Sequence, residues 1–297
     1  MTRILCIGEA MAEIRRDGPG YAVGFAGDTF NTAVYCRRRL RRGTVGYLTR
    51  IGTDPLSAGF LALARQEGLD VTSVGRETAQ NIGIYTVQTD DRGERSFAYW
   101  RDASAARQLF RQPEDLAALD TADLIYLSGI TLAILSPEAR MSLLKRLAAL
   151  RQGGKRVAFD SNYRPRLWPD AQTARRVITE AWTVTDIALP SVDDEIALFQ
   201  DADDAAVLQR LRGLGLRQGA LKRGARGPVA LDPDVAAFDF PPAARVVDTT
   251  AAGDSFNGGF LAAWADGADT TACLSAGHAL ARIVVSRPGA IVATEDT

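Results

Sequence analysis

The sequence contains only one histidine, His278, among its 297 residues. This argues against catalysis by serine–histidine–aspartate or cysteine–histidine groups and against metal sites built from several histidines. His278 lies in an alanine-rich, helix-like stretch, where packing or the wall of a ligand pocket suits it better than acid–base chemistry. Any general base in this protein is therefore expected to be a carboxylate.

Cysteine and excess charge are also scarce. The three cysteines, Cys6, Cys36 and Cys273, show no C-x-x-C spacing, which is typical of reduced, buried thiols in a cytoplasmic protein. A formal net charge of -1 gives no electrostatic reason to expect nucleic acid or a membrane as partner. The basic run at residues 37–42 ends an expected helix and is interpreted as a solvated face that complements the helix dipole.

Long apolar runs are absent as well. No stretch approaches the roughly 20 residues that span a bilayer. The N-terminus leads directly into strand-like residues 4–7, without the apolar core of a signal peptide. We therefore expect a soluble intracellular protein.

Short β-branched runs alternate with amphipathic helical stretches along most of the chain. Strands are expected at residues 4–7, 45–49, 124–127, 157–160, 187–189 and 220–222, and helices at residues 29–42, 56–66, 137–152, 171–182, 205–214, 255–265 and 271–285. This alternation predicts a doubly wound, mostly parallel α/β sheet in a single domain over residues 1–297. In such sheets ligands bind at the carboxyl ends of the strands, where Asp160, Lys222 and the loop before Gly253 fall.

Two segments, at about residues 10–25 and 82–101, break this alternation. The first is rich in glycine, and the second reads as two strands, 84–88 and 95–100, around the turn sequence Asp-Asp-Arg-Gly at 90–93. We interpret the insertions as a small β-sheet lid that could keep water from a reacting group. An antiparallel extension of the main sheet is the alternative.

Residues 248–256, Asp-Thr-Thr-Ala-Ala-Gly-Asp-Ser-Phe, carry the strongest functional signal. Small residues at a helix start let backbone N–H groups approach a phosphate closely, and the helix dipole favours an anion there. Asp254 would repel that anion, a conflict that suits a general base beside a phosphoryl group. The alternative is a plain helix start whose dipole Asp254 complements.

Several polar residues suggest a small acidic ligand. Asp28 opens the first long helix and suits either a helix cap or a contact to sugar hydroxyls. Strand alternation places Tyr99 and Arg101 on one face and Trp100 on the other. Arg164 follows a strand end, and because arginine matches carboxylate geometry, Arg101 and Arg164 together suggest a substrate with a carboxylate. Alternatively, Arg164 screens phosphate charge, or both arginines are surface residues.

The K-x-G-x-x-G at residues 222–227 suits either a nucleotide loop or a hairpin turn. No P-loop and no complete dinucleotide fingerprint occurs, which argues against a dehydrogenase. Ser191, Asp194 and Glu195 follow another strand end, where carboxylates could lie near a divalent ion or could simply complement a helix start.

Taken in order, these segments resemble the ribokinase-like (PfkB-type) carbohydrate kinases. The resemblance runs nearly end to end, through residues 8–9, 27–32, 93–101, 127–130, 160–168 and 248–256. The Tyr-Trp-Arg at 99–101 and the Asn-Tyr-Arg-Pro-Arg-Leu-Trp at 162–168 are more specific to the branch of this family that acts on ketodeoxygluconate. The resemblance implies a Rossmann-like α/β fold with a small β lid.

The resemblance also implies roles for individual residues. Asp254 would be the catalytic base, beside an anion hole of Ala251, Ala252 and Gly253. The sugar-acid contacts would be Gly27, Asp28, Asn31, Tyr85, Tyr99, Arg101 and Arg164. The nucleotide side would hold Asn162, Arg164, Ser191, Lys222, Gly224, Gly227, Gly253, Asn257 and Gly277, with Asp194 and Glu195 as metal-associated carboxylates. Two departures stand out: the family's N-x-x-E becomes Ser191 to Asp194, and its Gly-Ala-Gly-Asp becomes Ala-Ala-Gly-Asp.

The implied activity is ATP-dependent phosphorylation of 2-keto-3-deoxygluconate at its terminal hydroxyl. ATP and Mg²⁺ would be required, and a monovalent cation is left open. The partners would be a small sugar acid and ATP, with no nucleic acid or membrane, and a homo-oligomer formed through the lid is left open. The alternatives are a kinase for another sugar acid or a neutral sugar, such as ketodeoxygalactonate, fructose or ribose, and a sugar-acid sensor without catalysis.

Overall fold

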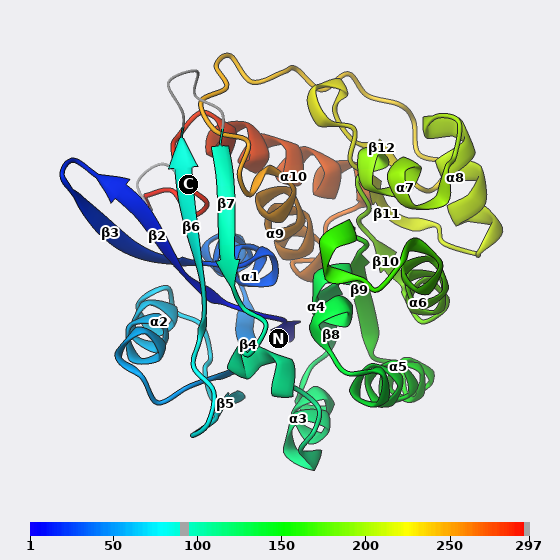
Figure 1. Ribbon diagram of the computed structural model, residues 1–297. Helices are drawn as coiled ribbons and strands as arrows, with labels where there is room; N and C mark the ends of the chain where they lie inside the picture. Colours follow the sequence, from blue (N-terminus) through cyan, green and yellow to red (C-terminus); the bar gives the residue numbers. More distant parts are fainter. Residues whose placement is uncertain (90–94, 294–297) are drawn as a thin grey trace.

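The computed structural model describes residues 1–89 and 95–293, and Figure 1 shows a large sheet among helices with a smaller sheet beside it. The large sheet has eight strands in the order β12-β11-β10-β9-β8-β1-β4-β5. Their bounds are β1 (Thr2–Ile7), β4 (Gly43–Ile51), β5 (Val74–Arg76), β8 (Leu124–Ser128), β9 (Arg156–Asp160), β10 (Ile187–Ala188), β11 (Gln218–Leu221) and β12 (Val229–Ala230). All pairs are parallel except β11 with β12, so the predicted doubly wound α/β sheet is confirmed.

Alternation along the strands builds two hydrophobic cores. In β1, Leu5 and Ile7 enter one core while Ile4 and Cys6 enter the other. The first core packs under α4 (Gly129–Ile134), α5 (Pro137–Gln152), α6 (Ala171–Thr183), α7 (Val192–Phe199) and α8 (Asp204–Gly213). The second packs under α1 (Asp28–Arg39), α2 (Pro55–Gln66), α9 (Ala252–Ala265) and α10 (Thr270–Val285). Burial on both faces explains why these strands read as short apolar runs.

The helix starts fall into two groups. Side chains of Asp54, Ser128, Ser136, Asp170, Asp203 and Asp269 cap α2, α4, α5, α6, α8 and α10. The helices α1, α7 and α9, together with the short α3 (Pro113–Ala118), begin without a side-chain cap. The N–H groups of Val192 in α7 and Ala252 in α9 donate to the carbonyls of Lys222 and Thr249, and the next N–H groups of these helices have no capping side chain as acceptor.

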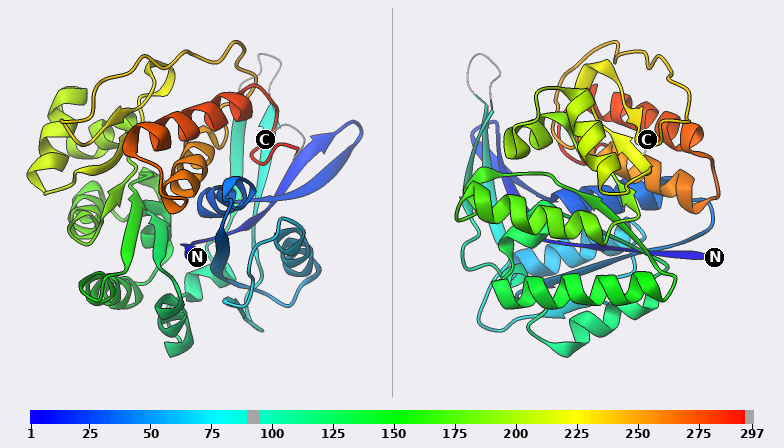
Figure 2. Two further views of the ribbon diagram at one scale, coloured as in Figure 1. Left: turned by 180° about the vertical axis from the view of Figure 1, so that it is seen from behind. Right: turned by 90° about the vertical axis from the view of Figure 1, so that its right-hand side faces the viewer.

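The small sheet has the order β3-β2-β6-β7, with β2 (Met11–Asp17), β3 (Gly20–Ala26), β6 (Gly83–Thr89) and β7 (Arg95–Trp100). We call it the lid. In the right-hand view of Figure 2 it lies over one end of the large sheet, on the side away from the N-terminus. Since β1 starts at the N-terminus and runs in parallel with its neighbours, this is the end where the strands finish. The lid is thus a separate sheet, not an extension of the main one.

The structure also corrects several details of the sequence interpretation. The segment at 10–25, expected as part of the lid but without strands assigned to it, is a two-stranded hairpin, β2–β3. The turn at 90–93 lies outside the described residues. The glycines after Lys222 do form a hairpin turn, η4 (Gly224–Arg226), between β11 and β12. The remaining short turns are η1 (Ala105–Gln108), η2 (Leu119–Thr121) and η3 (Pro165–Leu167).

Three smaller observations complete the fold. Within the described part of the chain, no helix is long and apolar enough to cross a membrane. The basic run is not wholly solvated, because Arg38 is buried against Glu67. His278 has a packing environment: its Nε2 lies 2.8 Å from the carbonyl of Pro241, beside the ring of Phe240. The single histidine thus anchors the extended segment that leads to α9.

Candidate active site

One cavity of about 1150 Å³ lies between the lid and the carboxyl ends of the main strands. It collects most of the residues predicted from the sequence. Among its lining are Gly27, Asp28, Asn31, Tyr85, Tyr99, Arg101, Asn162, Arg164, Ser191, Asp194, Lys222, Ala251, Ala252, Gly253 and Asp254. Segments from nearly the whole length of the chain therefore meet at one place, as expected for a doubly wound sheet.

The start of α9 is shaped to receive an anion. Ala251, the residue before the helix, has the left-handed backbone angles φ 60 and ψ 17, which a non-glycine residue adopts only at a cost. No side chain caps the helix, and the amides of Gly253 and Asp254 fall in its first turn, where no intrahelical acceptor exists. These N–H groups and the helix dipole together favour a phosphoryl group there.

Asp254 stands in this first turn and faces α1. Nδ2 of Asn31 donates to its Oδ2 at 2.8 Å, and Oγ1 of Thr32 donates to its backbone carbonyl at 3.2 Å. Desolvation of the carboxylate, followed by repulsion from Asp28, raises the pKa of Asp254 to about 7, while the Asn31 bond and the charge of Lys222 act in the opposite direction. A carboxylate with such a pKa can accept a proton near neutral pH.

Asp28 ties three segments together. It is the first residue of α1, whose cap position is Gly27, so the expected capping role of Asp28 is wrong. Its Oδ2 accepts from Oγ of Ser128 and from Nδ2 of Asn162, the latter at 2.8 Å. Asn162 has a positive φ of 31, a strained backbone at a position that lines the cavity. The network holds α1 against the ends of β8 and β9.

A buried cation lies below the start of α9. Nζ of Lys222 donates to Oδ2 of Asp160 at 2.5 Å and to Oδ1 of Asn257 at 3.1 Å. A Cβ built on Gly253 would lie 3.4 Å from this Nζ, so the ammonium group is close to the open amides. An ammonium has three donors, and these two bonds leave one for a further acceptor. Asp160 itself was not assigned a site role from the sequence.

The lid supplies the other end of the cavity. The rings of Tyr85 and Tyr99 stack with centroids 5.8 Å apart, and Arg101 follows at the end of β7. Tyr99 and Arg101 line this cavity while Trp100 does not, which confirms the predicted alternation. Oη of Tyr85 donates to Glu13, and burial beside that carboxylate raises the pKa of Tyr85 well above its usual value.

Both arginines proposed to bind a carboxylate already have acidic neighbours. Arg101 pairs with Glu9 in a buried contact, and Nη1 of Arg164 lies 3.0 Å from Oδ1 of Asp194 in an exposed one. Glu9 was part of the family resemblance but was not assigned a role from the sequence. A charged residue directly after a buried strand was the signal that could have identified it.

Five predicted residues lie outside the lining of the cavity. Gly224 and Gly227 belong to the hairpin turn, and Asn257 is buried behind Lys222. Gly277 permits close packing of two helices, since a Cβ there would lie 2.8 Å from the carbonyl of Phe256 in α9. Glu195 has no exposed surface and pairs with Arg210, so it does not reach the cavity as the metal assignment required.

The donor set restricts how a divalent ion could be held. Among the described residues, no group of three or more histidine, cysteine or acidic side chains is placed to hold a metal ion. Asp194 lines the cavity and Asp160 is engaged by Lys222. This arrangement fits Mg²⁺ bound mainly through substrate phosphates and water with one or two carboxylates, and not a cage made by the protein alone.

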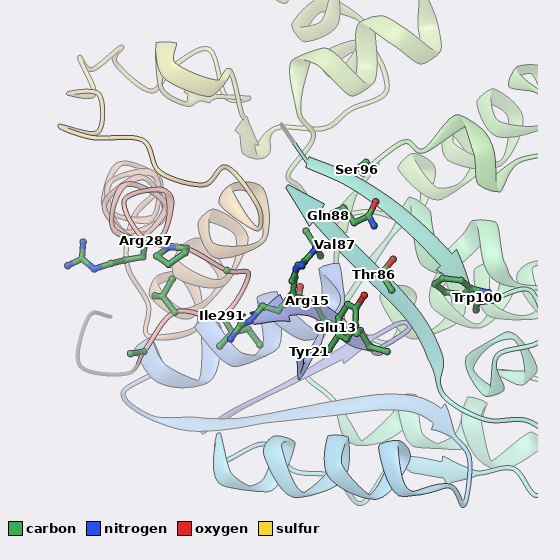
Figure 3. Close-up of a pocket in the computed structure, with 16 residues that line it drawn as sticks. Glu13, Arg15, Tyr21, Thr86, Val87, Gln88, Ser96, Trp100, Arg287 and Ile291 are labelled. Carbon is green, nitrogen blue, oxygen red and sulfur yellow. Dashed lines mark ion pairs between the residues drawn. The ribbon is translucent and has the colours of Figure 1, made fainter. Parts of the chain in front are cut away.

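A second cavity, of about 1260 Å³, lies between the lid and the segment after α10. Figure 3 shows Arg287 and Ile291 to the left, Glu13 and Arg15 of the lid near the centre, and Trp100, on the other face of the lid, to the right. None of the residues predicted for the site lines it. It is therefore not the candidate active site.

Comparisons with known proteins show the family of this chain. The whole chain, residues 1–297, matches the pattern of the pfkB family carbohydrate kinases. The chain therefore belongs to the pfkB family of carbohydrate kinases.

Within that family it is 39% identical to the 2-dehydro-3-deoxygluconokinase of Dickeya dadantii, over 98% of this chain and 97% of that protein. It is 38% identical to the 2-dehydro-3-deoxygluconokinase of Escherichia coli K12, over 99% and 98%. The fold also matches fructokinase from Vibrio cholerae O395 in its fructose-, ADP- and calcium-bound form, with a TM-score of 0.86, 22% identity and coverage of 99% and 96%. At that identity the match describes the fold alone.

Proposed function

We propose that this chain is a 2-dehydro-3-deoxygluconokinase. It transfers the γ-phosphoryl group of ATP to the terminal 6-hydroxyl of 2-dehydro-3-deoxygluconate, also called 2-keto-3-deoxygluconate, and forms the 6-phosphate. The observation that carries the proposal is one cavity with Asp254 beside the uncapped start of α9 and two arginines at its rim. The two relatives named above, both close to 40% identical over nearly the whole chain, support the same substrate.

At the phosphoryl end, Asp254 acts as the general base. It accepts the proton of the attacking hydroxyl, and a pKa of about 7 keeps it ionised in a useful fraction at neutral pH. The amides of Gly253 and Asp254, with Ala251 and Ala252 leaving room, stabilise the charge on the transferring group. Lys222 adds a positive charge next to these amides.

At the sugar end, the substrate lies between the lid and α1. Arg101 and Arg164 recognise the carboxylate, and Tyr85 and Tyr99 form a wall beside it. Gly27, Asp28 and Asn31 line the part of the cavity next to Asp254, where the sugar hydroxyls lie.

The nucleotide lies on the opposite side, near Asn162, Ser191 and Lys222. The turn with Gly224 and Gly227 follows Lys222, while Asn257 supports Lys222 from behind and Gly277 packs against α9. Asp194, which lines the cavity and pairs with Arg164, is the carboxylate that would help to hold Mg²⁺ on the phosphates, and the ion would supply electrostatic stabilisation of the transferring group. Requirements for Mg²⁺ and for a monovalent cation remain predictions, to be tested by adding each ion to protein treated with a chelator.

The experiment that tests the proposal is a coupled ATP assay over a panel of acceptors. 2-Keto-3-deoxygluconate is expected to give the highest kcat/KM, above ketodeoxygalactonate, fructose and ribose. A higher value for one of the other three would replace the proposed substrate by that sugar. Binding of the sugar acids without turnover of ATP would instead support a non-catalytic sensor.

A further proposal concerns assembly and location. Tyr21, Val23 and Trp100 are 73%, 53% and 61% exposed, and strand register places them on one face of the lid. Exposed apolar side chains on a sheet face suit contact with a second copy of the chain. Sedimentation of the wild type and of Trp100→Glu tests this, with loss of a dimer expected in the variant.

A cytoplasmic location stays a prediction from the three unpaired cysteines.

A further inference from the structure

Glu9 is a buried carboxylate to which the roles above give no task. It follows β1, is 2% exposed and lines the sugar end of the cavity. Nη2 of Arg101 donates to its Oε2, and Oγ of Ser104 donates to its Oε1. Both carboxylate oxygens are thus occupied, and the charge is balanced by the guanidinium, which makes its burial tolerable.

The contact with Glu9 leaves one edge of Arg101 available. Nη2 is taken by Glu9, and Nε is buried without a partner. Among the residues that the structure describes, no acceptor binds Nη1. Because Arg101 lines the cavity, Nη1 is the donor that an acidic ligand would meet first.

Glu9 also lies where the chain passes between the two sheets. The chain crosses at residues 8–10, at Gly27, at residues 77–82 and at residues 101–104. A Cβ on Gly27 would lie 2.2 Å from the carbonyl oxygen of Glu9, and a Cβ on Gly83, just after the third crossing, would lie 2.9 Å from its Oε1. Its side chain bonds to the fourth crossing. Glu9 is thus held in place from every side.

We propose that Glu9 is a positioning residue for substrate recognition: it fixes the guanidinium of Arg101 so that Nη1 meets the carboxylate of the sugar acid. The inference rests on the proposed function, which supplies the acidic substrate. Arginine has many side-chain conformers, and an unpaired Arg101 would have to be ordered by the substrate itself. Glu9 does this ordering before the substrate arrives.

The test is steady-state kinetics with 2-keto-3-deoxygluconate and ATP on Glu9→Ala, Glu9→Gln, Arg101→Ala and the double variant Glu9→Ala/Arg101→Ala. Glu9→Ala is expected to raise KM for the sugar acid about tenfold, with kcat and KM for ATP within about twofold of the wild type. The double variant is expected to be no worse than Arg101→Ala alone, because Glu9 acts through Arg101. Glu9→Gln is expected to recover most of the loss, since an amide oxygen still accepts from Nη2.

Glu67→Ala is the matched control. It removes another carboxylate–arginine pair, the partly buried one with Arg38, which joins the ends of α1 and α2. If Glu9 had a purely structural role, Glu67→Ala and Glu9→Ala would lower the melting temperature to a similar extent, and neither would change KM for the sugar acid. If Glu9→Ala does not fold, Glu9→Asp replaces it, because the shorter side chain keeps the charge but loses its reach to Arg101.

Three results would overturn the inference. The first is an unchanged KM for the sugar acid in Glu9→Ala or Glu9→Asp, and the second is losses that multiply in the double variant. The third is a lower KM in Glu9→Gln, which would mean that Glu9 competes with the substrate for Arg101. A wild type that does not phosphorylate the sugar acid would overturn the proposed function itself and the inference with it.

Discussion

The two ends of the cavity hold their carboxylates differently. At the phosphoryl end, the side chain of Asp254 receives one hydrogen bond from the described residues, from Asn31. At the lid end, Glu9 receives bonds from both Arg101 and Ser104. Burial, followed by repulsion from Asp28, raises the pKa of Asp254, and the single bond from Asn31 only partly opposes this. Glu9 instead lies against the opposite charge of Arg101. The first arrangement favours proton transfer, and the second favours recognition.

The helix starts differ in a related way. Capping side chains begin α2 and α10, which start away from the cavity, and also α4, whose Ile130 lines it, while the short α3 is uncapped away from the cavity. The helices α1, α7 and α9 begin at the cavity and have no such cap. Capping contributes about 1 kcal/mol to a helix, so these three helices give up stability where a ligand can take the place of the cap.

The largest expected effect is the loss of kcat when the candidate base at the phosphoryl end of the cavity is replaced. Asp254→Asn keeps the shape of the side chain but cannot accept a proton, so kcat is expected to fall about a thousandfold. Binding of the sugar acid, measured by titration calorimetry, is expected to stay within about threefold of the wild type because the lid end is intact. A kcat within tenfold of the wild type would remove Asp254 from the role of base.

The next effect is expected at the lid end. Arg101→Ala removes the donor for the substrate carboxylate, and KM for the sugar acid is expected to rise about 10- to 100-fold. KM for ATP should not change, because the proposed nucleotide site is at the other end of the cavity. The exposed Arg176, on α6, provides the control, and Arg176→Ala should leave both KM values unchanged. Equal increases for acid and ATP would contradict the division of the cavity.

A third effect is expected in stability. The pKa of Asp254 is higher in the folded protein than in the unfolded chain, so its ionisation costs stability, most fully above pH 7. Asp254→Asn removes this cost and is expected to raise the free energy of unfolding by about 4 kcal/mol at pH 8, since each unit of the pKa difference corresponds to about 1.4 kcal/mol. The gain should shrink as the pH falls toward 4, where the carboxyl group is protonated in both states. Urea unfolding at pH 8 and pH 5 measures it, and a destabilised variant at pH 8 would argue against the raised pKa.

The smallest effect is a shift in the pH profile. The value of kcat/KM is expected to rise about tenfold per pH unit up to about pH 7 and then level off as Asp254 ionises. Asp28→Asn removes a repelling charge and should move this midpoint down, whereas Asn31→Ala removes a stabilising bond and should move it up. Each shift is expected to be below about one unit. Shifts in the same direction would show that the midpoint does not belong to Asp254.

Local sequence patterns were sufficient to predict much of the fold and part of the candidate site. The alternation of strands and helices predicted the α/β sheet, and the strand register of Tyr99 and Arg101 followed from a period of two. The small residues before Asp254 predicted an open helix start, which α9 has. The hairpin at 11–26 was missed as strands because its glycines and arginines do not form the apolar alternation of a buried strand.

Sequence by itself determined the class of fold and predicted an open helix start at α9 with Asp254 in its first turn, because each depends on neighbours within a turn or a strand. Only the tertiary structure decided which charges meet. Glu9 and Arg101 are 92 residues apart, Asp28 and Asn162 are 134 apart, and Lys222 and Asp160 are 62 apart. Such pairs form only when the strands have taken their places in the large sheet and the lid has packed over the carboxyl ends of these strands. No local pattern predicts them, and they set the charge of every group that the substrate meets.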